Sequence, residues 1–590
     1  MSTIYQLIYV VFVVNLCVIT HVIGYNNEFK QYPETSELKS EYDFIVVGAG
    51  SAGCVLANRL SEIADWSVLL IEAGGPETFN MDVPALAGLN QHTSFDWSYY
   101  AEPSNHFGLG LENQTMYFPR GKVMGGSSVT NFMIYTRGNP KDYDQWNITG
   151  WSYIDVEKYF LKLENYNVPD PDNEFGNDGP MYINVVPYHS NLSNHILKAA
   201  QEYGLPLINT NGPKQVGVSR LQSTIKNGVR FSTNTGYLTP IRNSRPNLHL
   251  IRNCQVTKVL VDNFADSNPK ASGVQFVCSD GKISTIFTRK EVILSAGAIN
   301  SPQILMLSGI GPKNHLTELD IPLIKDLPVG DNMMDHINMF GLQFLVNQTV
   351  FPKSDFDLYE TERSGPLSTP AAVEVISFSQ QVGSEIPSIE QLFISSPPGK
   401  LVCENFNLKQ DIYEEIYKPV ETLPGFLVFS LLQHPKSRGW LRLRDSNPFS
   451  KPKIFPNYLS HPEDIDMLIL GIKEAINISK QPSLQQYGTT LYNKPITQCK
   501  NYEFGSDDYW KCQIRTTTFT LYHQCGTCKM GEIGDPTAVV DSELKVQGVL
   551  GLRVVDASVM PEIITGHPNG PVIMIAEKAA DLIKKDWNRT

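Results

Sequence analysis

A β-branched run that enters a glycine-rich turn is the feature that most constrains this chain. Residues 42–47 read Tyr-Asp-Phe-Ile-Val-Val and predict a buried strand, and residues 54–60 continue with helical apolar periodicity. Between them Gly48, Gly50 and Gly53 have the GxGxxG spacing. In such a turn the first glycine permits a tight bend, the second lets the backbone approach a pyrophosphate, and the third lets helix and strand pack closely. The stretch therefore predicts a strand-turn-helix unit with a dinucleotide at the helix N-terminus.

A second predicted strand supports this interpretation. Residues 67–71 are mostly apolar, and Glu72 follows Gly53 by 19 residues. At that spacing a carboxylate can accept hydrogen bonds from a ribose diol. The turn alone does not separate NAD from FAD.

The size and charge of the chain limit the classes of protein it can belong to. It has 590 residues, which is enough for two or more domains with their own cores. With 61 acidic and 48 basic residues, its formal net charge is −13. An excess of negative charge disfavours nucleic acid and anionic membranes as partners.

The N-terminal segment predicts secretion. Residues 1–24 hold no charged side chain and are mostly apolar, which is typical of a signal peptide cut before Tyr25. A retained membrane anchor is the alternative, although no stable membrane insertion is expected. Six glycosylation sequons also favour an extracellular protein; they begin at Asn113, Asn147, Asn191, Asn347, Asn477 and Asn588.

Eight of the nine cysteines remain after removal of such a signal peptide. An oxidising compartment would allow disulfides, and Cys499 and Cys512 bracket a short loop suited to one. Cys54 lies on the predicted nucleotide helix, where a free and buried thiol is expected.

Further along the chain, several segments carry strand or helix patterns. Strands are predicted at 256–261, 291–298, 426–432, 439–444 and 552–558, and helices at 301–311 and 572–585. The short alternating strands between 337 and 520 favour an antiparallel sheet with helices on one side.

Two other segments carry groups suited to a polar ligand. Residues 119–131 combine glycines, hydroxyls and two cations, which can contact a phosphate or the polar edge of a ring system. In the tail, His523 and His567 lie near glycine- and proline-rich turns. Cys525 and Cys528 have CxxC spacing, but no second ligand pair follows, so no metal is expected. Asp335 and His336 have no accompanying nucleophile elbow, and we expect a structural loop there.

With these motifs the chain resembles the glucose-methanol-choline (GMC) family of FAD-dependent oxidoreductases, from about residue 42 to 587. Residues 297–311 fit the second signature of the family. Residues 121–131 fit the first signature at most positions, with Met124 and Thr130 as departures. The amino-acid sequences of these motifs are most similar to those of the secreted arthropod branch, which includes glucose dehydrogenase-like proteins and mandelonitrile and salicyl alcohol oxidases.

Together with the strand and helix patterns, the resemblance implies an α/β fold. It has a Rossmann-type FAD-binding domain and a discontinuous α+β substrate domain built on an antiparallel sheet. The FAD-binding domain is expected at 40–160, 215–336 and 523–590, and the substrate domain at 161–214 and 337–522. FAD is the implied cofactor. The implied cofactor residues are Gly48, Gly50, Ser51, Ala52, Gly53, Glu72, Ala73, Arg120, Gly121, Val123, Gly125, Ser127, Ser128, Asn131, Phe132, Met133, Ile134, Val256, Asp556, Ala557, Asn569, Pro571 and Val572.

The active-site pair of the family falls on His523 and His567, although Gln524 and Cys525 stand where Pro-Val is usual. The resemblance implies oxidation of a CH–OH group, with a histidine removing the O–H proton and the hydride passing to flavin N5. We expect His523 to be the base and His567 to bind the substrate oxygen, with the reverse assignment open. The pair could also merely satisfy core hydrogen bonds.

The substrate and the electron acceptor stay open in the sequence. A set of aromatic residues favours a small aromatic alcohol or cyanohydrin over a sugar. These residues are Phe95, Trp97, Tyr99, Tyr100 and Tyr522. A hydroxynitrile lyase with redox-silent FAD, a sugar (glucose) dehydrogenase and a non-catalytic relative are the alternatives. Oxygen or a quinone would accept the electrons, and the protein would be a monomer or homodimer.

Overall fold

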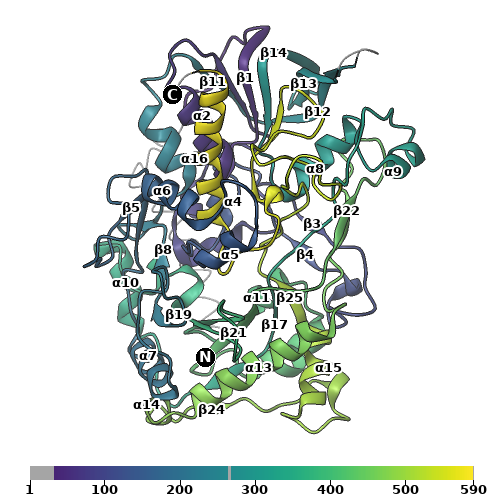
Figure 1. Cartoon of the computed structure of the whole chain (residues 1–590). Coiled ribbons are helices and arrows are strands. Elements are labelled where there is room, and N and C mark those ends of the chain that lie inside the picture. Colours follow the sequence, from purple (N-terminus) through teal and green to yellow (C-terminus); the bar gives the residue numbers. More distant parts are fainter. Residues whose placement is uncertain (1–31, 264–267, 589–590) are drawn as a thin grey trace.

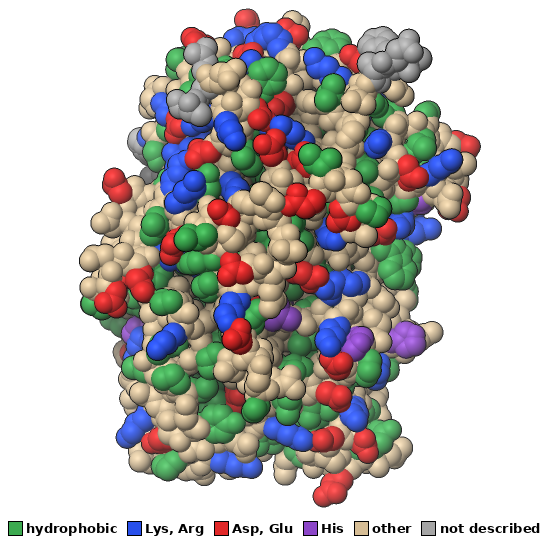
Figure 2. Space-filling model, in the orientation of Figure 1, with side chains coloured by type: hydrophobic (Ala, Val, Ile, Leu, Met, Phe, Trp, Pro, Cys, Tyr) green, Lys and Arg blue, Asp and Glu red, His purple; other side chains and the backbone are tan. Residues whose placement is uncertain are grey.

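The computed structural model describes residues 32–263 and 268–588, which form two large sheets with helices around them (Figure 1). The signal peptide predicted at residues 1–24 lies outside the described residues. In the ranges that are described, no helix combines the length and apolar character needed to cross a membrane. On the face drawn in Figure 2, acidic and basic side chains are intermixed.

The predicted strand-turn-helix lies at the centre of a mostly parallel sheet. β1 (Glu41–Val47) lies between β2 (Val68–Ile71) and β14 (Ile283–Leu294), and β11 (Leu248–Ile251) continues the sheet beyond β2. Nearly all side chains of β1 and β2 are buried, as expected for parallel strands covered on both faces.

The long β14 joins this parallel part to an antiparallel extension. Its first half pairs with β13 (Lys270–Cys278), which pairs with β12 (Cys254–Asp262). Its last residues pair in parallel with β26 (Leu552–Val554). The chain therefore returns to the first sheet after more than 200 residues in other parts of the fold.

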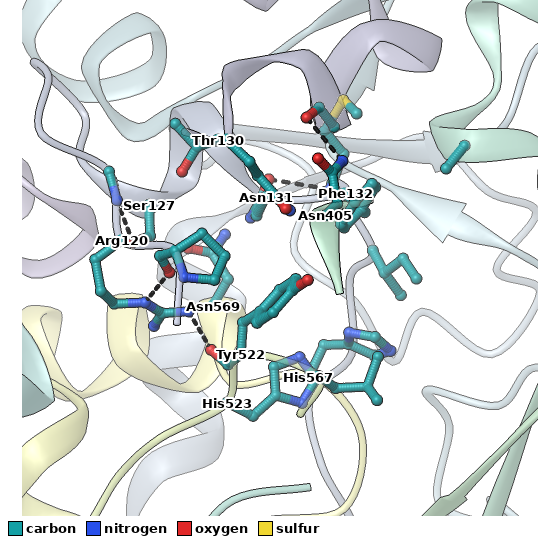
Figure 3. A pocket seen from close by; sticks show the side chains of 18 of the residues that line it. Arg120, Ser127, Thr130, Asn131, Phe132, Asn405, Tyr522, His523, His567 and Asn569 are labelled. Carbon is teal, nitrogen blue, oxygen red and sulfur yellow. Dashed lines mark hydrogen bonds between the residues drawn. The ribbon is translucent and has the colours of Figure 1, made fainter. Parts of the chain in front are cut away.

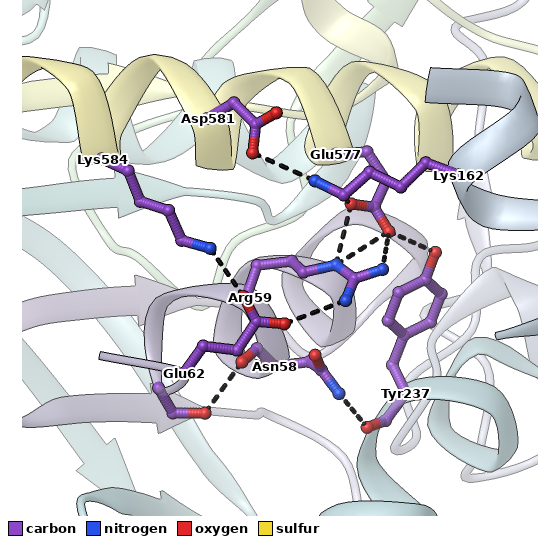
Figure 4. A network of polar contacts seen from close by, with 9 residues as sticks. Asn58, Arg59, Glu62, Lys162, Tyr237, Glu577, Asp581 and Lys584 are labelled. Atoms are coloured by element: carbon purple, nitrogen blue, oxygen red, sulfur yellow. Dashed lines mark hydrogen bonds and ion pairs between the residues drawn. The ribbon is translucent and has the colours of Figure 1, made fainter. Parts of the chain in front are cut away.

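Two helices from opposite ends of the chain lie side by side next to this sheet (Figure 1). α2 (Ser51–Leu60) follows the glycine turn, and α16 (Asn569–Asp586) is the last helix of the described chain. A buried ion pair joins them, because Arg59 of α2 donates two hydrogen bonds of 2.8 Å to the fully buried Glu577 of α16 (Figure 4). Breaking a buried pair typically costs about 3–5 kcal/mol, so this contact holds the last turn of α2 against the middle of α16.

The second helix of the nucleotide domain begins earlier than predicted. α8 spans Gly297–Leu307, whereas the Ser-Pro pair suggested a start at residue 301. Pro302 lies inside the helix and cannot donate to the carbonyl of Ala298. The Thr527 hydroxyl donates to that carbonyl at 2.6 Å instead, which removes the cost of the missing bond.

The second sheet is antiparallel, as predicted. Its main strands are β7 (Gly217–Arg220), β19 (Val373–Ser379), β20 (Ile389–Ile394), β21 (Gly425–Leu432), β18 (Gln343–Leu345) and β24 (Thr490–Leu491). β17 (Ile337–Met339) pairs with β21, and β25 (Thr518–Thr520) pairs with β17. α13 (Pro462–Ser479) packs against β20 and β21. The expected domain boundaries stay a prediction; β7 belongs to this sheet although it follows residue 215.

Smaller elements complete the fold. The predicted strand at 439–444 is β22 (Trp440–Arg442), which pairs with β23 (Lys453–Phe455) outside the large sheets. The other short strands are β3 (Tyr99–Tyr100) with β4 (Tyr117–Phe118), β5 (Glu164–Tyr166) with β6 (Met181–Val185) and β8 (Gln222–Ser223), β9 (Ile225–Lys226) with β10 (Val229–Arg230), and β15 (Ile310–Gly311) with β16 (Lys325–Asp326). Further long helices are α6 (Tyr153–Leu163), α7 (Asn191–Tyr203), α10 (Lys353–Glu362) and α15 (Asp507–Thr517).

Two disulfides stabilise the described chain. The predicted bond between Cys499 and Cys512 is confirmed. A second bond, which the sequence did not indicate, joins Cys254 of β12 to Cys278 of β13. Cys54 is free and buried, as predicted, and so are Cys403, Cys525 and Cys528.

Candidate active site

A cavity of about 1070 Å³ is lined by residues from both large sheets and from the turns between them. Both histidines and most of the predicted cofactor residues line it. They are Gly48, Gly50, Ser51, Ala52, Glu72, Ala73, Arg120, Gly121, Ser127, Asn131, Phe132, Met133, Ile134, Val256, Asp556, Ala557, Asn569, Val572, His523 and His567.

Five of the predicted cofactor residues do not line the cavity: Gly53, Val123, Gly125, Ser128 and Pro571. Their contacts are with the protein. A Cβ at Gly53 would lie 1.8 Å from the Gly48 carbonyl oxygen, and the Ser128 hydroxyl donates to the Gly125 carbonyl at 2.6 Å. These residues support the residues that line the cavity and do not line it themselves.

The glycine turn leaves room for a ligand at its second position. Gly48 has φ +95°, a conformation that favours glycine. Gly50 lines the cavity, and a Cβ there would meet only the Cα of Gly126, at 4.0 Å. Nothing in the described chain fills this space, which fits the close approach of a cofactor diphosphate.

Two helix N-termini meet at this end of the cavity. The Ser51 hydroxyl at the start of α2 donates to Asn569 Oδ1 at the start of α16, at 2.7 Å. The first N–H groups of a helix have no carbonyl partner in the helix, and the helix dipole favours negative charge there. This donor set is suited to a diphosphate.

Glu72 lies buried beside the turn. Its carboxylate accepts from the backbone N–H groups of Ala49 and Gly74, both at 2.7 Å. Burial raises the pKa of Glu72 to about 7, against the lowering effect of these hydrogen bonds. Its position at the cavity wall fits the predicted contact with a ribose.

The two candidate catalytic histidines approach each other in the same cavity. The rings of His523 and His567 lie 4.7 Å apart, nearly perpendicular, and both side chains line the cavity (Figure 3). Burial lowers the pKa of His523 well below its ordinary value, and the neighbouring His567 and His336 lower it further. His523 is therefore neutral at physiological pH.

The hydrogen bond with a third histidine, His336, determines which nitrogen of His523 carries the proton. His336 is fully buried, and its Nε2 lies 3.0 Å from the carbonyl oxygen of Gln433, which can only accept. His336 Nδ1 lies 2.9 Å from His523 Nδ1. Because burial lowers the pKa of His336 to about 3, His336 is neutral and its Nδ1 accepts. His523 therefore carries its proton on Nδ1, and its Nε2 has a free lone pair.

His567 is oriented by a carboxylate. Its Nε2 lies 2.9 Å from Oε1 of Glu390, a fully buried residue of β20. The other oxygen of Glu390 accepts from Gln433 Nε2 at 3.0 Å, and Gln433 Oε1 accepts from the N–H of Gly566. One glutamine thus connects the supports of both histidines.

The unusual Gln524 takes part in holding the His523 loop. Buried Asp335 accepts from the His523 N–H at 2.9 Å and from Gln524 Nε2 at 2.7 Å. Cys525 pairs with Met334 through two backbone hydrogen bonds. The segment at Asp335 and His336, which the sequence suggested was only a structural loop, therefore contacts a candidate catalytic residue.

The side of the cavity closed by the antiparallel sheet is mainly apolar. Its wall includes Leu86, Val350, Phe351, Leu392, Phe406 and Phe429. Of the aromatic residues considered as pocket residues, Trp97 and Tyr522 line the cavity, while Phe95, Tyr99 and Tyr100 do not. The Tyr99 hydroxyl donates to Asn300 instead.

Comparisons with known proteins agree with this arrangement. Family models described as GMC oxidoreductase match residues 42–338 and 435–576. A glucose dehydrogenase [FAD, quinone] of Drosophila melanogaster is 38% identical over 94% of this chain and 88% of its own length. An ecdysone oxidase of Bombyx mori is 34% identical over 94% of this chain and 84% of its own.

Solved structures have the same fold. Pyridoxine 4-oxidase from Mesorbium loti has a TM-score of 0.79 and 26% identity, covering 92% of this chain and 98% of its own. A fungal aryl-alcohol oxidase, with a TM-score of 0.75 and 24% identity over 93% of this chain and all of its own, supports the fold alone. The chain thus belongs to the GMC oxidoreductase family, whose members are FAD-dependent oxidoreductases acting on CH–OH donors.

Proposed function

We propose that this FAD-dependent enzyme oxidises the CH–OH group of a small, mainly apolar alcohol, with an aromatic alcohol favoured over a sugar. The observation that carries the proposal is the mainly apolar lining of the cavity that also contains His523 and His567. A sugar presents hydroxyls on every side, and burying them against aliphatic side chains would cost free energy without compensating hydrogen bonds.

FAD, when bound, supplies the acceptor for the carbinol hydride. The glycine turn, Glu72 and the N-termini of α2 and α16 would hold it, and these residues leave the two histidines for the substrate. The protein's own contribution is to position the alcohol, to exclude water and to accept a proton.

His523 is the proposed base. Its Nδ1–H donates to His336, so Nε2 can accept the O–H proton of the alcohol. The positive charge that forms lies on a ring whose loop is held by the carboxylate of Asp335 through the backbone N–H. His567, oriented by Glu390, would bind the substrate oxygen and keep the carbinol carbon in a fixed place.

A sugar substrate with a quinone acceptor is the second candidate function. It is supported by the relatives that carry the name glucose dehydrogenase [FAD, quinone], at 38% identity. Oxygen or a quinone as the acceptor stays part of the proposal. A hydroxynitrile lyase would use the same cavity but leave the flavin oxidised.

We also propose that the protein is secreted and glycosylated. Two disulfides support an oxidising compartment. In each sequon that lies wholly within the described ranges, the asparagine is exposed; these are Asn113, Asn147, Asn191, Asn347 and Asn477. Expression in a secreting cell and treatment of the medium with a glycosidase would test this: a protein retained in the cell, or one without a mass shift, would contradict it.

A substrate panel tests the reaction. Purified holoenzyme is mixed with benzyl alcohol, cinnamyl alcohol, mandelonitrile and glucose while flavin absorbance and peroxide release are followed together. We expect bleaching by the aromatic alcohols and little by glucose. Bleaching by glucose alone would favour the second candidate, and consumption of mandelonitrile with oxidised flavin would identify a lyase.

A further inference from the structure

We infer that the substrate carries a second hydrogen-bonding group besides its reacting alcohol, and that Tyr522 and Gln91 recognise that group. The inference rests on the proposed function, because it concerns the same cavity. It makes Tyr522 a residue that determines specificity, with an apolar alcohol bearing a further hydroxyl as the class of substrate.

The backbone of Tyr522 is strained. Its φ is +69°, which is rare for a residue with a bulky side chain. The Tyr522 N–H donates to Thr520 Oγ1 at 2.7 Å, and its carbonyl accepts from the guanidinium of half-buried Arg120. Such strain persists only where the surroundings over-determine the conformation, and it clusters at functional sites.

This conformation places the Tyr522 ring in the cavity, one residue before the proposed base. In Figure 3 the side chain projects into the cavity with its hydroxyl end turned away from His523. The ring lies almost parallel to that of Phe406, with centroids 6.1 Å apart and planes inclined by 20°. The packing against Phe406 restricts the positions that the hydroxyl can take.

Hydrogen-bond geometry gives the hydroxyl no partner among the described residues, although the Gln91 side chain lies close enough to act on its pKa through a side-chain hydrogen bond. Within the part of the chain that the structure describes, Tyr522 Oη and Gln91 Oε1 are both buried and both lack a hydrogen bond, and both residues line the cavity. Burial raises the pKa of Tyr522, and the side-chain hydrogen bond with Gln91 opposes that rise only in part, so the phenol stays protonated. A buried polar group without a partner destabilises the folded protein, and a ligand that pairs with it removes that cost.

The two atoms are complementary to a hydroxyl. The neutral phenol of Tyr522 donates, and the amide oxygen of Gln91 accepts. A ligand hydroxyl between them can accept from the first and donate to the second. Gln91 follows the turn of residues 84–90, which Asn405 anchors by donating to the Gly88 carbonyl at 3.0 Å. The acceptor is therefore held in place from outside the His523 loop.

The residues around Tyr522 restrict the kind of substrate body that can bear the second hydroxyl. Phe406, Leu86 and Phe429 line the same side of the cavity. An aromatic or alicyclic substrate with two hydroxyl groups would pack its ring against these apolar side chains. One hydroxyl would lie at the histidines, and the other would hydrogen-bond to Tyr522 Oη and Gln91 Oε1.

The test compares the Tyr522→Phe holoenzyme with the wild type. Phenylalanine keeps the ring and its packing and removes only the hydroxyl. The probes are benzyl alcohol and its 2-, 3- and 4-hydroxy derivatives, and kcat/KM is measured from flavin reduction. We expect the wild type to prefer the best hydroxy derivative by about tenfold or more, since one hydrogen bond to a buried group is worth that ratio.

In Tyr522→Phe that preference should fall to near one. Tyr99→Phe is the matched control, because the Tyr99 hydroxyl donates to Asn300 and does not line the cavity; it should keep the wild-type preference. If Tyr522→Phe keeps the preference, or if the wild type shows none, the inference is wrong while the proposed function stands. If none of the probes reduces the flavin, the proposed function fails and the inference fails with it.

Discussion

The Nδ1 atoms of His336 and His523 lie 2.9 Å apart, although the two residues are separated by 187 positions in the chain. Neutral His336 has one ring N–H, and it donates that N–H to the Gln433 carbonyl. The hydrogen bond between the two rings is therefore donated by His523. A contact between two buried imidazoles thus determines which nitrogen of His523 can act as a base.

Replacing His336 should slow removal of the alcohol proton, because His336 orients His523 and does not itself contact the substrate. His336→Leu removes the acceptor for His523 Nδ1–H, so the His523 ring can adopt the other tautomer or turn. We expect flavin reduction to slow by about tenfold or more, with KM changed less than kcat. His249→Leu, at a half-buried position outside the cavity, is the control. Equal rates of flavin reduction for His336→Leu and the wild type would contradict the proposal that His336 positions His523.

The pH profile of flavin reduction should show an acidic limb at low pH. A base must be unprotonated, and the pKa of His523 is well below 6.5 because the ring is buried and has two histidine neighbours. The rate should therefore stay constant above about pH 6.5 and fall only at more acidic values. His567 lowers that pKa, so His567→Asn should move the limb to higher pH. A limb that moves to lower pH, or does not move, would contradict this assignment.

The glycine turn offers a pair of substitutions with different outcomes. Gly53→Ala places a Cβ 1.8 Å from the Gly48 carbonyl oxygen, and the backbone must shift, so we expect a lower melting temperature and loss of FAD. Gly50→Ala meets no protein atom closer than 4.0 Å, so the protein should fold but retain less FAD. Gly399→Ala, with no atom within 4 Å and a negative φ, is the neutral control. Full FAD content in Gly50→Ala would contradict the proposed diphosphate site.

The bond between Cys499 and Cys512 should affect stability and not catalysis. It closes a loop with a sequence separation of 13, and neither residue lines the cavity. Replacing both cysteines by serine should lower the free energy of unfolding by about 2–4 kcal/mol, measured by denaturant titration. The rate of flavin reduction should be unchanged at 25 °C, and a large loss of rate would show that the bond supports the site.

Contiguous motifs made much of the fold predictable. The β1 strand, the glycine turn and α2 are one local unit, so its residues determine its structure without distant partners. The same holds for β21, whose apolar run specifies a buried strand. The start of α8 was misplaced because Thr527, far away in the sequence, compensates for Pro302.

The candidate site was predicted where it follows motifs and missed where it depends on distant contacts. His523, His567 and most cofactor residues line one cavity. The roles of His336, Glu390 and Gln433 arise only when β20, β21 and the loop before β17 meet, and no local spacing encodes that meeting. The bond between Cys254 and Cys278 was missed for the same reason, since it depends on the register of β12 against β13.

The central claim is that His523 removes the proton of the alcohol. The most direct measurement is anaerobic mixing of wild-type, His523→Ala and His567→Ala holoenzymes with the best alcohol of the panel, with flavin absorbance followed in time. The account predicts rapid bleaching in the wild type, a rate at least about 100-fold lower in His523→Ala, and a smaller loss in His567→Ala. Bleaching of His523→Ala at the wild-type rate would contradict it.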